Sequence, residues 1–272
     1  MCIRDSVVSE RLADPATSQA RPATGPSLVP AALAAALAVA VAILGPLGAR
    51  SGLLPSGAGE GLFRGAIPLA VTAIVMAIMA MRRSGWRRTG ALVIAVAVGA
   101  ALQPIRTRIA AWSAPPIHDV TTDLANPPRY VAVAKLRVPP ANSVDYGGEA
   151  VARQQRASYG DLRPLIVKAP PPRALAMAAD TARAEGWTVL AQDIGFGDLG
   201  RLEATDTSFL FGRLDDIVVR IVPHPAGSRV DVRSSARDEG ADDGRNARRI
   251  RRFLAFLAER AAAEPASAPA PR

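Results

Sequence analysis

Residues 200–221, GRLEATDTSFLFGRLDDIVVRI, alternate polar and apolar side chains over two stretches that are separated by a short break. A period of two is typical of a β-strand with one buried face. In the first stretch the apolar set is Leu202 and Ala204, opposed by Glu203, Thr205 and Thr207. In the second the apolar set is Ile217, Val219 and Ile221, opposed by Asp216, Val218 and Arg220. The pattern predicts two neighbouring strands.

A third stretch, residues 227–236 (GSRVDVRSSA), repeats this alternation, with Val230 and Val232 on one side. Burial of a large aliphatic side chain is worth about 1.5–3 kcal/mol, so the apolar sides should face covering helices. We therefore expect the polar sides to form one exposed, charged face of the sheet and to bind a ligand or partner. Its predicted members are Glu203, Thr205, Asp216, Arg220, Asp231 and Arg233.

The flanking segments complete a two-layer domain over residues 113–260. Strands are predicted at 165–169 and 187–194, and helices at about 170–186 and 242–260. Short connections between the later strands indicate an antiparallel meander. The predicted fold class is α+β, with about five strands covered on one face by two helices. The remaining segments are a proline-rich irregular arm (113–129), a polar loop containing a short helix near 149–157 (within 141–164), and a disordered tail (261–272).

Three apolar runs precede this domain within residues 28–111: 28–49, 62–81 and 89–105. About 20 apolar residues cross a hydrocarbon core of about 30 Å, so each run is predicted to span a membrane. Gln103 and Pro104 are expected to shorten the third. A signal peptide is the alternative for the first run, but its length and the apolar runs that follow favour a retained helix. Residues 1–27 are predicted to be a disordered tail, whose first six resemble a translated adapter.

Arginines predict the orientation of the spans. Arg82, Arg83, Arg87 and Arg88 lie between the second and third runs without an acid, against Arg106 and Arg108 at the far end. Arginine-rich loops stay in the cytoplasm. We therefore expect a bacterial inner-membrane protein with a cytoplasmic N-terminus and a periplasmic C-terminal domain. The spans hold no Asp, Glu or His, which favours an anchor over a transporter.

Composition narrows the partners. The formal net charge is +9, but many arginines flank the apolar runs or lie in the last helix, and no aromatic residues alternate with them as in single-strand binders. We expect the lipid bilayer as a partner, and not nucleic acid. With one cysteine, two histidines and no zinc or calcium spacing, we expect no disulfide, metal site or cofactor.

Several long motifs resemble one family. They are residues 200–221, GSRVDVRSSAR (227–237), NARRIRRFL (246–254), IHDVTTDLANPP (117–128) and YGDLRPL (159–165). In this order they resemble a bacterial and plastid family catalogued as domain of unknown function 1499, over about residues 113–260. Arg213 and Ala236 stand where that family more usually has an aromatic residue and a serine. The resemblance implies no reaction, substrate or cofactor.

These observations favour a non-enzymatic periplasmic binding or structural module, with no catalytic residue assigned. The arm and a turn are predicted to add four side chains to the ligand- or partner-binding face: His118, Asp119, Asp206 and Asp215. The alternative is an envelope hydrolase using Asp206 or Asp215, which needs a closed pocket holding that acid beside His118. Glu203 cannot assist Asp206, because the two point to opposite sides of one strand. A second alternative, lipid handling, needs a tunnel under the sheet. The acids before the last helix are expected to cap it.

Overall fold

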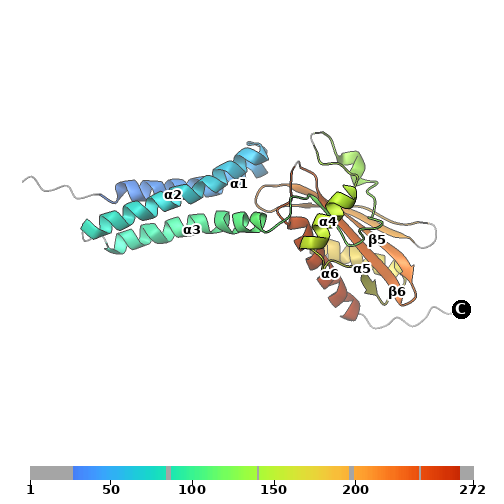
Figure 1. The fold of residues 1–272 in the computed structure, drawn as a ribbon. Helices are drawn as coiled ribbons and strands as arrows, with labels where there is room; N and C mark the ends of the chain where they lie inside the picture. The colour runs from blue at the N-terminus through green and yellow to red at the C-terminus, as the bar shows by residue number, and fades with distance from the viewer. Residues whose placement is uncertain (1–26, 84–86, 140, 196–198, 239, 264–272) are drawn as a thin grey trace, which may run out of the picture.

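The structure is a computed structural model of the chain, and it describes residues 27–83, 87–139, 141–195, 199–238 and 240–263. Most of the two predicted tails lies outside these residues. Two parts lie end to end in Figure 1: an elongated bundle of three helices, and a mixed domain of sheet and helices. This arrangement confirms the predicted α+β fold class with an N-terminal helical section.

The bundle consists of α1 (Val29–Arg50), α2 (Ser56–Arg83) and α3 (Arg87–Trp112). Each helix is long and apolar enough to span a membrane. The third helix is longer than the predicted span (89–105), because α3 continues through Pro104 to Trp112. Proline removes one backbone hydrogen bond, but such losses are tolerated where neighbouring helices pack around them. Pro104 is buried in the bundle, and α1 and α2 also contain an internal proline.

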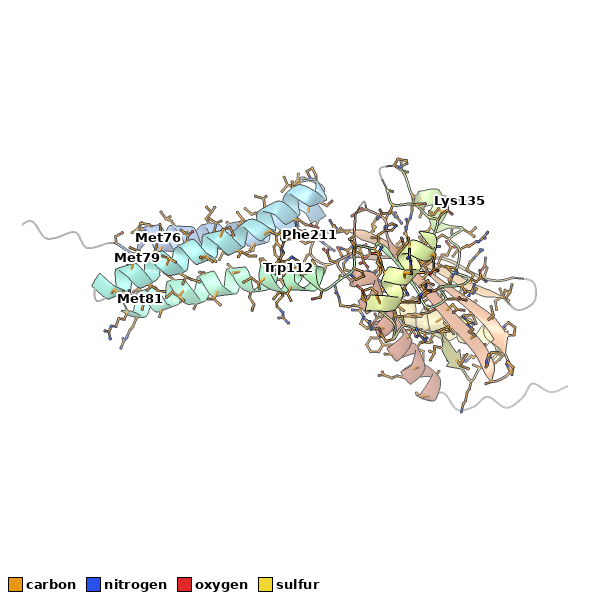
Figure 2. The ribbon with its side chains drawn as sticks, in the orientation of Figure 1. Met76, Met79, Met81, Trp112, Lys135 and Phe211 are labelled. Carbon is orange, nitrogen blue, oxygen red and sulfur yellow. The ribbon has the colours of Figure 1, made fainter. Side chains whose placement is uncertain are left out.

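Small residues allow the helices to approach closely. A Cβ atom on Gly45 of α1 would lie 2.5 Å from the carbonyl oxygen of Gly59 in α2, and one on Gly59 would lie 2.6 Å from that of Gly45. Glycine pairs at such crossings are typical of membrane helices. Large apolar side chains instead project outward, as Met76 and Met79 do along the bundle in Figure 2. The outer surface of the bundle therefore suits lipid.

The sheet has the strand order β1-β6-β5-β4-β3, with every pair antiparallel. Its long strands are β3 (Thr188–Ile194), β4 (Gly200–Thr207), β5 (Leu214–His224) and β6 (Gly227–Ala236). Two short strands, β1 (Asp119–Thr121) and β2 (Leu165–Val167), share the outer edge of β6. β1 was missed within the arm, because three residues are too few to show a period of two.

Helices α5 (Pro171–Ala184) and α6 (Arg245–Ala263) cover the apolar face predicted from the alternation. Leu202, Val219 and Val232 stand side by side across β4, β5 and β6 and belong to this core. The ring of Phe253 in α6 stacks on Trp187 with centroids 4.8 Å apart. α6 is therefore a core helix, as expected.

Two polar side chains form hydrogen bonds with the backbone, one at the start of α6 and one along β1. Asp242 caps α6 as predicted for the preceding acids, accepting bonds from the backbone N–H groups of Gly244 (2.9 Å) and Asn246 (2.7 Å). Gln155 lies in α4 (Gly148–Ser158), the helix expected within the polar loop. Its amide donates to the carbonyl oxygen of Thr121 and accepts from the Thr121 N–H, so it replaces a missing strand at the edge of β1.

Candidate functional site

The side chains of the predicted charged face do share one side of the sheet. In the register of β4, β5 and β6, Thr205 lies opposite Asp216, and Arg220 lies opposite Asp231. Glu203 and Arg233 both lie opposite Val218, from its two sides. The alternation in sequence was sufficient to place all six together, because side-chain direction in a strand follows from position alone.

The expectation that this face is exposed is wrong. Glu203, Asp216 and Asp231 are 0% exposed and Arg233 is 2% exposed. The described residues between β1 and α4 (122–139 and 141–147) lie over them and include the 3-10 helix η1 (Val133–Leu136). Burial of a charge is tolerated when partners satisfy it, and this covering segment supplies many of those partners. It begins within the predicted arm (113–129) and extends to α4, and it is called the arm from here on.

Each acid of the face holds part of the arm. The Glu203 carboxylate accepts hydrogen bonds from the backbone N–H groups of Val131 (2.9 and 3.0 Å) and Val133 (2.9 Å) at the start of η1. The Asp216 carboxylate accepts from Arg137 (2.8 Å), while its backbone oxygen accepts from the hydroxyl of Tyr130 (2.9 Å). These acids therefore act as attachment points for the arm.

Arg233 is the most densely bonded cation of the face. It forms an ion pair with Asp119 of β1 at 2.6 Å and donates to the carbonyl oxygens of Pro128 (3.1 Å) and Val144 (2.8 Å). It also lies 4.7 Å from the ring centroid of Tyr130. Asp119, which was predicted to contribute to the face from the arm, thus forms a buried ion pair. The guanidinium therefore connects β1 and two separate positions of the arm to the centre of the sheet.

Arg220 of β5 and Asp231 of β6 form a further group of contacts with the arm. Arg220 bonds Asp123 (2.8 Å), Asp231 (2.9 Å) and the carbonyl oxygen of Asn126 (2.9 Å). Two cavities of about 470 and 530 Å³ flank the arm and leave parts of Arg220 and Arg233, respectively, on their walls. Ligand binding by the six side chains stays a prediction, but most of their hydrogen-bonding capacity already serves the arm.

Asp206 and Asp215 lie on the opposite side of the sheet, beneath α6. Arg249 bonds Asp206 at 2.8 Å and Asp215 at 2.5 Å, and Arg245 bonds Asp215 at 3.0 Å. Burial alone would raise the pKa of Asp215, but the Arg249 and Arg245 guanidiniums outweigh it and hold that pKa below its usual value. Glu203 and Asp206 do point to opposite faces, as predicted.

His118 is partly buried, and burial lowers the pKa of its imidazole. Its backbone oxygen accepts from the Ala236 N–H (2.8 Å) and the Asn246 amide (2.9 Å), which fixes the residue before β1 beside β6 and α6. None of the three cavities described here is lined by His118, Asp206 or Asp215. Within the described residues, no group of three His, Cys, Asp or Glu could hold a metal ion. The hydrolase alternative stays a prediction.

Asp215→Asn is expected to lower the free energy of unfolding by about 2 kcal/mol at pH 7, because the amide cannot form the two charge-assisted contacts. The lowered pKa makes the Asp215 contribution complete above the unfolded value, near 3.8, and lost as pH falls through the folded value. Thermal unfolding of the full chain in detergent micelles checks this between pH 7 and pH 3. The variant should lose less of its melting temperature on acidification; a loss equal to that of the unmodified chain would contradict the assignment.

A further site lies where the bundle meets the domain, at the β4–β5 hairpin. Arg50, at the end of α1, donates to the carbonyl oxygens of Ser208 and Phe209, both at 2.9 Å. Arg213 pairs with Glu60 of α2 at 2.6 Å. The ring of Phe211 packs edge-on against Phe63 of α2, with centroids 5.4 Å apart. Figure 2 shows Phe211 at the domain end of the bundle.

The turn of this hairpin depends on glycine. Gly212 has φ +67, and a Cβ there would lie 3.2 Å from the Cα of Arg50. A side chain would be disfavoured both by the backbone conformation and by the contact with α1. Together with the contacts of Arg50, Arg213 and Phe211, this close approach holds the domain against the bundle.

Beside this contact lies a cavity of about 760 Å³, hereafter the junction cavity. Its walls come from α2, α3, the β4–β5 hairpin and the start of α6. They combine aromatic and aliphatic groups with five arginines and two acids. The lining residues are Glu60, Phe63, Arg64, Gln103, Thr107, Arg108, Ala110, Ala111, Ser208, Phe209, Leu210, Phe211, Asp243, Arg245, Arg248 and Arg252.

Three of the five arginines have carboxylate partners: Arg64 with Glu60, Arg245 with Asp215, and Arg252 with Glu185. The other two, Arg108 of α3 and Arg248 of α6, form no ion pair with any residue that the structure describes. Arg108 lies 5.8 Å from the ring centroid of Trp112, and Arg248 donates to the backbone oxygen of Asp243 at 3.1 Å. The cavity is therefore basic, with one unpaired guanidinium from each part of the molecule.

Sequence reasoning missed this cavity. From the sequence, Arg108 was considered only as a charge at the end of a span, and Arg248 only as part of the polar side of the last helix. The available signal was local: Glu60 and Arg64 are four residues apart at the start of α2, where a span begins with an ion pair. The convergence of α3 and α6 leaves no pattern in sequence.

The sequence model of a family described as "Protein of unknown function (DUF1499)" matches residues 119–257, just over half of the chain. The match includes the sheet, the arm, the β4–β5 hairpin and most of α6, but none of the three long apolar helices. No curated protein matches the chain. No solved structure matches it either. The domain side of the junction cavity thus falls within the family match, and its bundle side falls outside.

Proposed function

We propose a function from the premise that this chain belongs to the DUF1499 family of proteins of unknown function: it is a membrane-anchored binding module. Its ligand site is the junction cavity, and its ligand is an anionic amphiphile. The single observation that carries this proposal is the convergence of Arg108 and Arg248, both without a carboxylate partner among the described residues, on one cavity. An anion between them would bridge the bundle and the domain.

The expected level of the cavity in a bilayer supports an amphiphilic ligand. Between Arg88 and Arg106, the apolar part of α3 (residues 89–105) is about 26 Å long at 1.5 Å per residue. This length is close to the roughly 30 Å of a bilayer core. Thr107 and Arg108, which line the cavity, follow directly and would lie at the level of lipid headgroups. A ligand there meets lipid on one side and water on the other.

The lining also suits two kinds of chemical group. Guanidinium groups bind phosphate or carboxylate oxygens through charge-assisted hydrogen bonds. Phe63, Phe209 and Phe211 offer apolar surface beside them. A phosphorylated lipid provides both groups, whereas a soluble phosphate provides only the first. A binding role also fits the chemistry of the acids, because the carboxylates of Asp206 and Asp215 are held in ion pairs.

The proposed location is a bacterial inner membrane, with the N-terminus in the cytoplasm and the domain in the periplasm. Its support is the loop between α2 and α3, where Arg82, Arg83, Arg87 and Arg88 occur without an acid. Fusions of alkaline phosphatase and of a fluorescent protein to the C-terminus distinguish the two sides. Phosphatase activity without fluorescence supports this orientation, and the reverse pattern contradicts it.

Neutralising the two unpaired arginines tests the ligand. Arg108→Gln and Arg248→Gln should each weaken binding of phosphatidylglycerol about tenfold, since a hydrogen bond to a charged group contributes about 1.5–3 kcal/mol and 1.4 kcal/mol is tenfold. Native mass spectrometry of the full chain in detergent micelles, titrated with this lipid, measures the change. Phosphatidylcholine should bind weakly to every form, because its headgroup carries no net charge.

The matched control is Arg251→Gln. Arg251 lies on α6 like Arg248, but it pairs with Asp161 on the surface and does not line the cavity. Lipid affinity equal to that of the unmodified chain is expected for this control. Equal affinity in the Arg108→Gln and Arg248→Gln variants would contradict the proposed site. Glycerol 3-phosphate binding as tightly as the lipid would contradict an amphiphilic ligand.

A further inference from the structure

We infer that the β4–β5 hairpin is a membrane-contact element and that the Phe209 side chain inserts into the bilayer. Phe209 is 86% exposed, whereas Phe253, in the core under α6, is fully buried. An exposed aromatic ring at the tip of a hairpin contacts either water or an apolar phase such as lipid. Its position at the bundle selects the lipid phase.

The hairpin is held in a defined place. Arg50 bonds the backbone oxygen of Phe209 itself, and Phe211, two residues on, packs on Phe63 of α2. The backbone also closes on itself, because the Gly212 N–H donates to the Ser208 oxygen at 3.1 Å. These contacts attach the tip to the ends of α1 and α2, so Phe209 cannot turn toward the core of the domain.

Two other exposed apolar side chains lie at the same end of the bundle. Leu53, between α1 and α2, is 82% exposed, and Trp112, the last residue of α3, is 81% exposed. With Phe209 they come from three separate segments. Arg50 bonds the backbone of Phe209, and Arg108 lines the junction cavity together with Phe209. Aromatic residues beside arginines are typical of the boundary between hydrocarbon and headgroups. The hairpin therefore continues the lipid-facing surface of the helices.

Insertion has a physical benefit and a consequence. Transfer of a phenylalanine side chain from water to an apolar phase is favourable, while Arg50 can remain among the headgroups. The inserted ring would give the domain a second attachment to the membrane, in addition to the chain connection after Trp112. Because Phe209 also lines the junction cavity, insertion would place one wall of that cavity in contact with lipid.

Site-directed spin labelling tests the inference in the full chain. Cys2 is the only cysteine, so Cys2→Ser provides a background for single labels. Labels at Phe209→Cys, Val75→Cys and Ala226→Cys are compared in phosphatidylglycerol–phosphatidylcholine vesicles. The readout is the ratio of collisions with oxygen, which partitions into lipid, to collisions with a water-soluble nickel chelate.

The two reference positions bracket the expected result. Val75 lies on the exposed surface of α2, inside a candidate span. Ala226 lies in the β5–β6 turn at the other end of β5, which is 11 residues and so about 36 Å long. The label at position 209 should give a ratio severalfold above that at 226 and approaching that at 75.

A ratio at 209 equal to that at 226, with a high ratio at 75, overturns the inference and leaves the membrane anchor intact. A low ratio at 75 overturns both the spans and the insertion. Folding is not at issue at position 209, because the side chain that is removed is largely exposed and its aromatic neighbour Phe211 is retained. Thus the test separates this inference from the proposed function.

Discussion

Arg233→Ala is expected to lower the free energy of unfolding of the full chain by about 3–5 kcal/mol, because it leaves the Asp119 carboxylate buried without its partner. Asp119 is 1% exposed and Arg233 is 2% exposed, so water cannot replace the lost contact without opening the arm. The same change removes the donors to Pro128 and Val144. Denaturant unfolding in detergent micelles, followed by pulse proteolysis of the domain, measures the loss.

A double substitution separates the cost of the unpaired Asp119 charge from the loss of these backbone contacts, which both variants share. Asp119→Asn combined with Arg233→Met should be less destabilising than Arg233→Ala alone, since no buried charge remains unpaired. The matched control is Arg251→Ala, which breaks an exposed pair with Asp161 and should cost no more than about 1 kcal/mol. If Arg233→Ala costs no more than Arg251→Ala, the arm is not held by this ion pair.

Phe253→Ala is expected to cost about 3–5 kcal/mol, the usual range for deleting a fully buried aromatic ring. Phe253 is 0% exposed, and its ring stacks on Trp187 at an interplanar angle of 20°. The change creates a cavity between α6 and the sheet, because the strands cannot close over it. The same unfolding measurement applies, and the near-ultraviolet circular dichroism of Trp187 should weaken.

Phe256→Ala provides the control for this substitution on the same helix. Phe256 lies three residues further along α6 and is 45% exposed, so its removal should cost less than about 1 kcal/mol. Similar losses for the two variants would show that α6 does not cover the sheet through the side on which Phe253 lies.

Two sets of contacts organise the molecule. Ion pairs and hydrogen bonds hold the arm on the sheet, and the β4–β5 hairpin contacts the bundle through Arg50, Arg213 and Phe211. The junction cavity exists only because both parts are present. The DUF1499 match begins at residue 119, after the three helices of the bundle have ended, so the bundle side of the cavity is a property of this chain and not of the matched segment.

Patterns of short range were sufficient to predict most of the fold. The alternation in residues 200–221 and 227–236 placed side chains such as Leu202 and Glu203 on opposite faces, because the strand period does not depend on distant residues. The stripe on α6 and the three apolar runs followed from the same kind of regularity. β1 was not predicted, because a strand of three residues is too short to show a period of two.

The charged face shows where such reasoning ends. Charged side chains are expected in water because their burial without partners is costly. Glu203 is buried because backbone N–H groups near position 132 reach it, and Arg233 is buried because Asp119 does. These partners are distant in the sequence, and no characteristic spacing links them to Glu203 or Arg233, so the sequence could not predict the contacts.

The sequence by itself therefore determined the three helices that are apolar and long enough to span a membrane, the strand faces, the core side of the last helix and the family. Only the tertiary structure decided that the charged face is closed by the arm and that Arg108 and Arg248 meet at one cavity. The physical reason is that hydrophobic periodicity arises within each element, whereas the pairing of charges and the shape of a cavity depend on how separate elements dock.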